Sequence, residues 1–161
     1  NLRDSGVLTM NLIGGGATPE LIAVPSTTNS RATEGTEKSD ASGLWVTSHR
    51  WTIPATYTGR VSYLLTFKHK TNGAAGGSGW RVYNTTSGYA IPMPNPYGVF
   101  KNVQTYYTEW RVVCFGDPGD VIDLQMIGYA TTVYHKNIEI LCDDHRGSVI
   151  ADVASWSIAA V

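Results

Sequence analysis

The sequence has 161 residues, of which 42% are apolar, so it suits one domain with a packed core and excludes a disordered chain. Its 12 basic and 13 acidic residues leave a net charge of −1 and are scattered, which argues against a nucleic-acid-binding surface. No apolar run approaches the roughly 20 residues that a helix needs to cross a bilayer. Charged residues make up only 16%, which indicates that a partner covers part of the surface.

The N-terminal part of the sequence reads as two short strands followed by a loop. NLRDSGVLTM lacks an initiator methionine, and its first six residues form a polar lead into a strand at Val7. The apolar runs GVLTMNLI and ELIAV predict the two strands. Residues 25–42 contain almost nothing apolar and predict a long exposed loop.

From Gly43 onward the sequence alternates between strand-like runs and turns. The runs are rich in β-branched and aromatic residues, are bounded by Gly, Pro, Asn or Asp, and show no capped helical stripe. They cover residues 43–53, 59–70, 79–84, 103–115, 120–132, 135–141 and 147–158. Eight or nine strands at this spacing predict an all-β chain, an antiparallel sandwich or jelly roll that forms one domain over residues 1–161.

Two connecting segments raise the question of a partner or ligand. YAIPMPNPYGVF is stiffened by three prolines, and it fits packing on its own sheet as well as docking to a partner. The glycine-rich segment TNGAAGGSG could cradle a nucleotide such as ATP, or a phosphate, between subunits, with Lys70 and Arg81 for charge and Trp80 for stacking. It lacks the Lys-Ser/Thr end of a P-loop, so a hairpin tip is the preferred interpretation and no cofactor is required.

The reactive side chains form no recognisable enzyme or metal motif. Cys114 and Cys142 each end an apolar run, which favours two buried thiols over the alternative of a disulfide. The four histidines lie in separate segments, and no hydrolase signature is present. CDDHRG concentrates side chains of the kind that bind metals, but between two strands it fits a solvated, hydrogen-bonded turn better than a metal site. DPGDVID lacks the dense ligand spacing of a calcium loop, so no metal is predicted.

Three stretches resemble the trimeric jelly rolls of the tumour-necrosis-factor and complement-C1q type. They are RWTIPATYTGRVSYLLTFKH, FGDPGDVIDLQMI and SVIADVASWSI, and the resemblance spans residues 44–161. It implies a homotrimer whose aromatic side chains are buried between subunits, in keeping with the low surface charge. The aromatic candidates for that interface are Tyr106, Tyr107, Trp110, Tyr129, Tyr134 and Trp156, and each has a position in the chain's own core as its alternative.

The chain as a whole resembles the C-terminal part of the tail spikes, or pre-neck appendages, of phi29-like bacteriophages. That family implies an upstream trimeric β-helical stalk and a tail domain cut off autocatalytically after assembly, near Asn1 of this sequence. It also implies a virion component that is made in the cytoplasm of the host bacterium. A trimerising domain would raise the local concentration of the stalk segments and so act as an assembly chaperone. Any enzyme activity would then be a single self-cleavage.

The residues near the implied cut do not supply an obvious nucleophile. An N–O acyl shift needs Ser, Thr or Cys directly after the scissile bond, and Asn1 cannot serve. The nearest polar residues that could position or polarise that bond are Arg3, Asp4, Ser5 and Glu20. For Asp4 and Ser5 the preferred interpretation is that they cap the turn at Gly6. The reactive group is therefore expected outside the first ten residues.

Two other functions fit a β-sandwich of this composition. One is a lectin-like head domain that binds a host cell-wall glycan, and the other is a carbohydrate-binding module of a secreted enzyme. Both would stack sugars on aromatic rings and bind hydroxyls through polar side chains. The candidates are Trp45, Trp51, Trp80, Tyr89, Asn84, Asn95 and Asp144.

Overall fold

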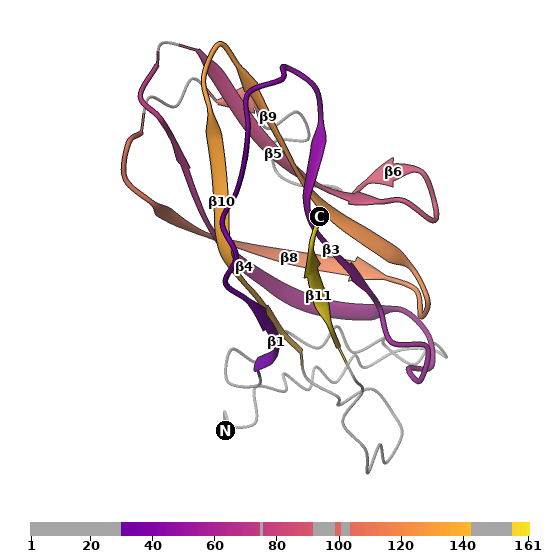
Figure 1. Ribbon diagram of the computed structural model, residues 1–161. Coiled ribbons are helices and arrows are strands. Elements are labelled where there is room, and N and C mark those ends of the chain that lie inside the picture. Colours follow the sequence, from indigo (N-terminus) through magenta and orange to yellow (C-terminus); the bar gives the residue numbers. More distant parts are fainter. Residues whose placement is uncertain (1–29, 75, 92–98, 101–103, 143–155) are drawn as a thin grey trace, which may run out of the picture.

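The computed structural model describes residues 30–74, 76–91, 99–100, 104–142 and 156–161, with residues 99 and 100 as backbone only. In this part of the chain every regular element is a strand, and the strands form two antiparallel sheets that face each other (Figure 1). An all-β antiparallel sandwich is therefore confirmed. The two strands predicted before residue 25, and residues 147–155 of the last predicted run, lie outside the described residues.

The strands are numbered in chain order, and Figure 1 labels most of them. They are β1 (Ser30–Glu34), β2 (Lys38–Asp40), β3 (Val46–Thr52), β4 (Val61–Thr71), β5 (Gly77–Asn84), β6 (Tyr89–Ala90), β7 (Val99–Phe100), β8 (Thr108–Gly116), β9 (Val121–Tyr129), β10 (Val133–Leu141) and β11 (Ile158–Ala160).

The two sheets are built from nested antiparallel pairs. The first sheet has the order β1-β10-β4-β8, with β2 also paired to β10, and the second has the order β11-β3-β9-β5-β6, with β7 also paired to β5. Strand β1 pairs with β10, β3 with β9, β4 with β8, and β5 with β6 and β7. The chain is thus one long hairpin folded over so that successive pairs enter alternate sheets.

Strands β1 and β2 occupy the segment that was expected to be an exposed loop, so that prediction is wrong for residues 30–34 and 38–40. Both strands pair through their backbones with β10 at one edge of the first sheet. Of the β1 side chains, Ala32 packs against the core, and Ser30 and Thr33 are exposed. A strand that is held at the edge of a sheet by backbone hydrogen bonds needs few apolar side chains. Its sequence therefore shows no alternation of apolar and polar residues.

The core lies between the sheets and is centred on β4. Strand β4 turns Tyr63, Leu65 and Phe67 inward, each fully buried. The Phe67 ring meets Trp80 of β5 edge-to-face at a centroid distance of 4.9 Å. Trp156, just before β11, packs 5.2 Å from the Tyr63 ring and closes the core at that end.

The two cysteines are buried free thiols, as predicted. Cys114 on β8 is the register partner of Tyr63 on β4, and the thiol of Cys142, directly after β10, lies 3.5 Å from the Ser62 carbonyl on the other side of β4. The cysteines therefore sit two strand spacings apart, about 9–10 Å, which is beyond the reach of a disulfide.

Ile91, in the described part of the proline-rich loop, bears on whether the loop packs on its own sheet or docks to a partner. Its side chain is 1% exposed and belongs to the core between the sheets, and its N–H bonds to the Val82 carbonyl at 2.9 Å. At Ile91 the loop therefore packs on its own sheet. Residues 92–98, which include the three prolines, lie outside the described residues.

Candidate functional site

The residues proposed to act near the implied cut lie outside the described residues. These are Asn1, Arg3, Asp4, Ser5 and Glu20. The self-cleavage chemistry therefore remains a prediction.

Lys70, Trp80 and Arg81 are not brought together in one subunit. Lys70 lies on the outer face of the first sheet, with its Nζ 4.7 Å from the centre of the Tyr134 ring. Trp80 is 2% exposed and lies in the core, where a nucleotide base cannot stack on it without opening the sandwich. Arg81 lies on the outer face of the second sheet. The three side chains thus occupy three different layers.

The aromatic candidates for a subunit interface divide between surface and core. Trp156 is buried in the core. Trp110 packs against the core, and its ring centre lies 5.1 Å from that of Trp80. Tyr106 is 70% exposed just before β8, and Tyr129 is 46% exposed at the end of β9. Tyr107 and Tyr134 are half-buried beside the lysines of the first sheet.

The outer face of the first sheet carries a row of apolar side chains across three strands. Because β4 turns its odd-numbered residues into the core, its even-numbered residues point outward. Leu64 is paired with Leu141 of β10 on one side and with Val113 of β8 on the other. We call Leu141, Leu64 and Val113 the apolar row. Val113, on the edge strand, is 57% exposed.

A second row, adjacent to the apolar row, contains charges of both signs. Thr66 lies between Glu139 of β10 and Arg111 of β8 in the register of the sheet, and Arg111 Nε bonds to Glu109 Oε1 at 2.8 Å. Leu64 and Leu141 of the apolar row, together with the second row, line a hollow of about 210 Å³. Its lining residues are Ser30, Leu64, Thr66, Glu109, Arg111, Glu139 and Leu141.

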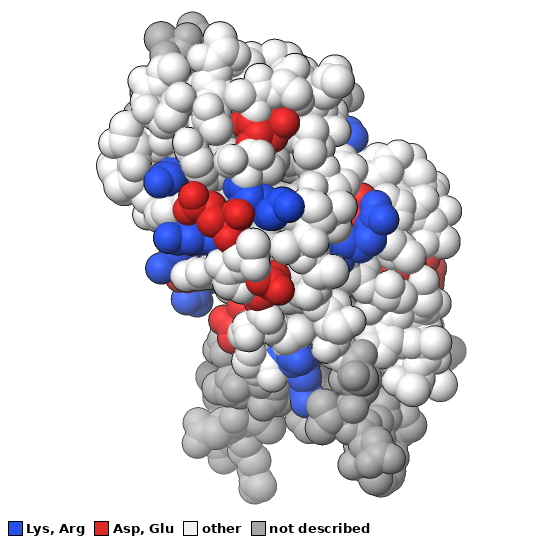
Figure 2. Space-filling view, viewed as in Figure 1, with Lys and Arg blue, Asp and Glu red and all other residues white. Residues whose placement is uncertain are grey.

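Lysines gather at the opposite end of the same face. Lys68 and Lys136 are direct cross-strand partners, and the ammonium groups of Lys136 and Lys70 lie 4.0 and 4.6 Å from the centre of the Tyr107 ring. The Tyr107 hydroxyl donates a hydrogen bond to Glu37, and burial together with this bond raises the pKa of Tyr107. On the face shown in Figure 2, charges of both signs are interspersed across the middle of the sandwich and few lie near its upper end.

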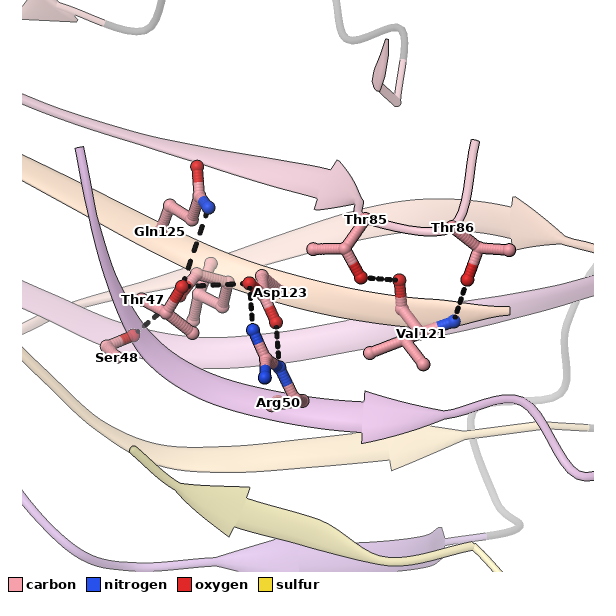
Figure 3. A network of polar contacts seen from close by, with 9 residues as sticks. Thr47, Ser48, Arg50, Thr85, Thr86, Val121, Asp123 and Gln125 are labelled. Carbon is pink, nitrogen blue, oxygen red and sulfur yellow. Dashed lines mark hydrogen bonds and ion pairs between the residues drawn. The ribbon is translucent and has the colours of Figure 1, made fainter. Parts of the chain in front are cut away.

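The outer face of the second sheet holds a polar network centred on β9 (Figure 3). Asp123, 1% exposed, accepts hydrogen bonds from Arg50 Nε at 2.6 Å, Arg50 Nη2 at 2.9 Å and Thr47 Oγ1 at 2.8 Å. Gln125 Nε2 lies 3.5 Å from Thr47 Oγ1, and Gln125 Oε1 accepts a bond from Arg81 Nε at 2.7 Å. The bidentate bond to Asp123 raises the pKa of Arg50.

The side chains suggested for glycan binding do not form one exposed platform. Trp51 and Trp80 are core residues, and the Asn84 amide is buried and bonded to Asp120 Oδ2 at 2.7 Å. Trp45 lies on the outer face of the second sheet, with the Arg81 guanidinium 4.4 Å from its ring centre. Asn95 and Asp144 lie outside the described residues, and Tyr89 packs partly against the core.

The structure brings together three histidines that the sequence leaves far apart. His69 and His135 are register partners on β4 and β10, with His135 Nε2 3.1 Å from His69 Nδ1. His135 Nδ1 lies 3.0 Å from Ser48 Oγ of β3, and His49 is also buried. One signal was present in the sequence: each of His69 and His135 stands two residues after an inward apolar residue of its strand.

Among the described residues, no group of three His, Cys, Asp or Glu side chains is placed to hold a metal ion. In the same part of the chain, no helix is long and apolar enough to cross a membrane. Neither a protein-family model nor a curated protein sequence matches this chain.

Proposed function

We propose that this chain is the C-terminal assembly domain of a bacteriophage tail spike. It is a jelly roll of the tumour-necrosis-factor and C1q type that forms a homotrimer through the outer face of its first sheet. As part of a virion, it brings three copies of an upstream β-helical stalk into register and is then released by self-cleavage near Asn1.

The nested strand pairing supports the jelly-roll part of this proposal. A jelly roll arises when a long hairpin is wrapped so that its successive strand pairs fall into two facing sheets. The pairs β1–β10, β3–β9, β4–β8 and β5–β7 follow that pattern, with the first and third in one sheet and the second and fourth in the other.

The observation that carries the assembly function is the apolar row beside the hollow. Val113 is exposed on the edge strand β8, whereas the hollow lies over β4, β10 and Ser30 of β1. A contact that places Val113 of one copy in the hollow of the next joins two different patches, and such head-to-tail contacts close into a ring when the rotation between successive copies adds up to a full turn. Burying one valine contributes on the order of 1.5 kcal/mol, and a trimer repeats that contribution three times.

We prefer assembly to glycan recognition because of where the aromatic rings lie. Trp51 and Trp80, two of the four rings suggested for sugar stacking, are 1% and 2% exposed. Trp45, a third, has Arg81 over its ring. A sugar would find fewer open aromatic faces than the sequence suggested.

The experiment is a substitution in the apolar row. Val113→Lys introduces a charge at the centre of the proposed contact and is expected to convert trimers to monomers at micromolar concentration. Thr52→Lys is the matched control, because Thr52 is an exposed strand residue of the second sheet. Light scattering gives the masses of both variants. If Val113→Lys keeps a trimeric mass and a folded spectrum, the assignment of this face is wrong.

The release step needs its own test, because it rests on the family resemblance alone. A longer chain that carries the stalk segment upstream of Asn1 is expected to yield the 161-residue product without added protease, and only after trimers form. A longer chain that assembles into trimers and stays intact would reject self-cleavage while leaving the assembly function in place.

A further inference from the structure

Three buried polar side chains connect the two sheets through the core. Ser48 of β3 belongs to the second sheet, and His135 of β10 and His69 of β4 belong to the first. Their exposed fractions are 0%, 0% and 1%. The apolar neighbour is Phe67, whose ring centre lies 5.2 Å from that of His135. Burying a polar group in the core costs free energy unless the group is hydrogen-bonded.

The hydrogen bond from Ser48 to the backbone of β9 is the basis on which we assign the protons of the two imidazoles. Ser48 Oγ donates its single proton to the Leu124 carbonyl at 3.0 Å, so toward His135 the hydroxyl can only accept. His135 must therefore carry its proton on Nδ1, which leaves Nε2 as an acceptor. His69 Nδ1, 3.1 Å away, must then be the donor to it. In this series of hydrogen bonds each group donates to the next, from His69 through His135 and Ser48 to the backbone of β9.

One nitrogen at the end of this chain has no partner. With its proton on Nδ1, neutral His69 has a lone pair on Nε2, and that buried atom makes no hydrogen bond. Within the series from His69 to Ser48, it is the one atom that can take up a proton without first breaking a hydrogen bond. A proton there would create a charged donor in the core with no acceptor to bind it.

The charged groups around the chain do not offset such a proton. His49 of β3 faces His135, and its pKa is itself lowered, mainly by burial. Lys38 of β2 is the register partner of His135 and repels a charge on His49. Glu34 of β1 is the one carboxylate that acts on these histidines in the described part of the chain, and it acts on His49. The neighbours of His69 and His135 are thus neutral or basic.

We infer that the chain from His69 through His135 to Ser48 is an acid-sensitive lock, which holds the two sheets together while both imidazoles are neutral and releases this part of the sandwich when His69 is protonated. The lock lies within one subunit, so it does not depend on the proposed trimer.

The sign of the pH dependence follows from burial. Burial lowers the pKa of His69 to about 4 and that of His135 well below its ordinary value. In the unfolded chain a histidine titrates near 6.5, so between pH 6.5 and pH 4 the unfolded state binds more protons than the folded state. The free energy of unfolding is therefore not reduced by these two histidines well above pH 6.5, and it falls as the pH is lowered from there toward pH 4.

The first test is urea unfolding between pH 8 and pH 4.5 at one protein concentration. For His69 alone, the unfolding equilibrium constant at pH 5 is expected to be about 30-fold larger than at pH 8. His69→Asn keeps an N–H donor toward His135 and cannot be protonated, so it should remove this 30-fold share. His49→Gln keeps a donor toward the Thr36 carbonyl, and this control should retain the 30-fold response that belongs to His69. An acid response in His69→Asn as large as in the wild type overturns the inference.

A second measurement on the wild-type protein covers the case in which His69→Asn does not fold. Long-range proton–nitrogen NMR distinguishes the two neutral forms of an imidazole. The expected result at pH 7.5 is a proton on Nδ1 of both His69 and His135. A proton on His135 Nε2, or a charged His69 ring at pH 6, contradicts the lock.

Discussion

Replacing Arg50 by methionine tests whether the polar network on the second sheet stabilises the fold. Arg50→Met removes the cation and keeps most of the aliphatic stem. The Asp123 side chain is 2% exposed and accepts hydrogen bonds from two Arg50 nitrogens and from Thr47 Oγ1. In the variant only the bond from Thr47 Oγ1 remains of these three. The substitution therefore leaves a buried carboxylate without its counter-ion.

The expected loss follows from the geometry of the pair. Breaking a fully buried ion pair by removing one partner costs about 3–5 kcal/mol, whereas an exposed pair contributes about 0–1 kcal/mol. The Arg50 side chain is 46% exposed, but the carboxylate is not, and the uncompensated carboxylate dominates the cost. We expect Arg50→Met to lower the free energy of unfolding by about 3 kcal/mol. Adding Asp123→Asn removes the stranded charge and should recover about half of that loss.

Urea denaturation followed by tryptophan fluorescence measures these changes. The matched control is Arg60→Met, because Arg60 and Asp117 form an exposed pair at 3.6 Å with side chains 54% and 60% exposed. The control should lose less than about 1 kcal/mol. The reasoning is refuted if Arg50→Met loses no more than Arg60→Met, or if the double variant is no more stable than Arg50→Met.

Two further predictions concern the backbone and the thiols. A Cβ at Gly76 would overlap the backbone oxygen of Tyr129, so Gly76→Ala should lower the unfolding free energy by about 1–3 kcal/mol, whereas Gly35→Ala, with open space around it, should change it by less than about 1 kcal/mol. Equal urea midpoints for the two alanine variants would contradict this. Both thiols are buried, and burial raises the pKa of Cys114, so an aromatic disulfide reagent should label Cys114 and Cys142 only on unfolding. Because the two thiols lie two strands apart, they should not form a disulfide with each other. Rapid labelling of the native protein, or a disulfide between the two cysteines in peptide maps, would be the contrary result.

The sequence could predict the central strands because they bury one face. The run at residues 59–70 became β4 (Val61–Thr71), and the run at residues 120–132 became β9 (Val121–Tyr129). Strands β1 and β2 could not be predicted in this way. They are held by pairing with β10, roughly 100 residues further along the chain, and that pairing leaves no local apolar pattern.

The candidate sites show where sequence reasoning stops. Neighbouring residues of a strand point to opposite faces, so Trp80 and Arg81 could have been separated from the sequence alone. The meeting of His69 and His135 could not, because it depends on the register between strands 66 residues apart. The apolar row likewise depends on register, which places Leu141 and Val113 on either side of Leu64.

The mass of the native protein in solution tests the central claim most directly. Light scattering at micromolar concentration should give three times the chain mass of 17.5 kDa, about 52 kDa, and Val113→Lys should reduce it to that of one chain. A folded wild-type protein that remains a monomer under these conditions would contradict the proposed assembly function.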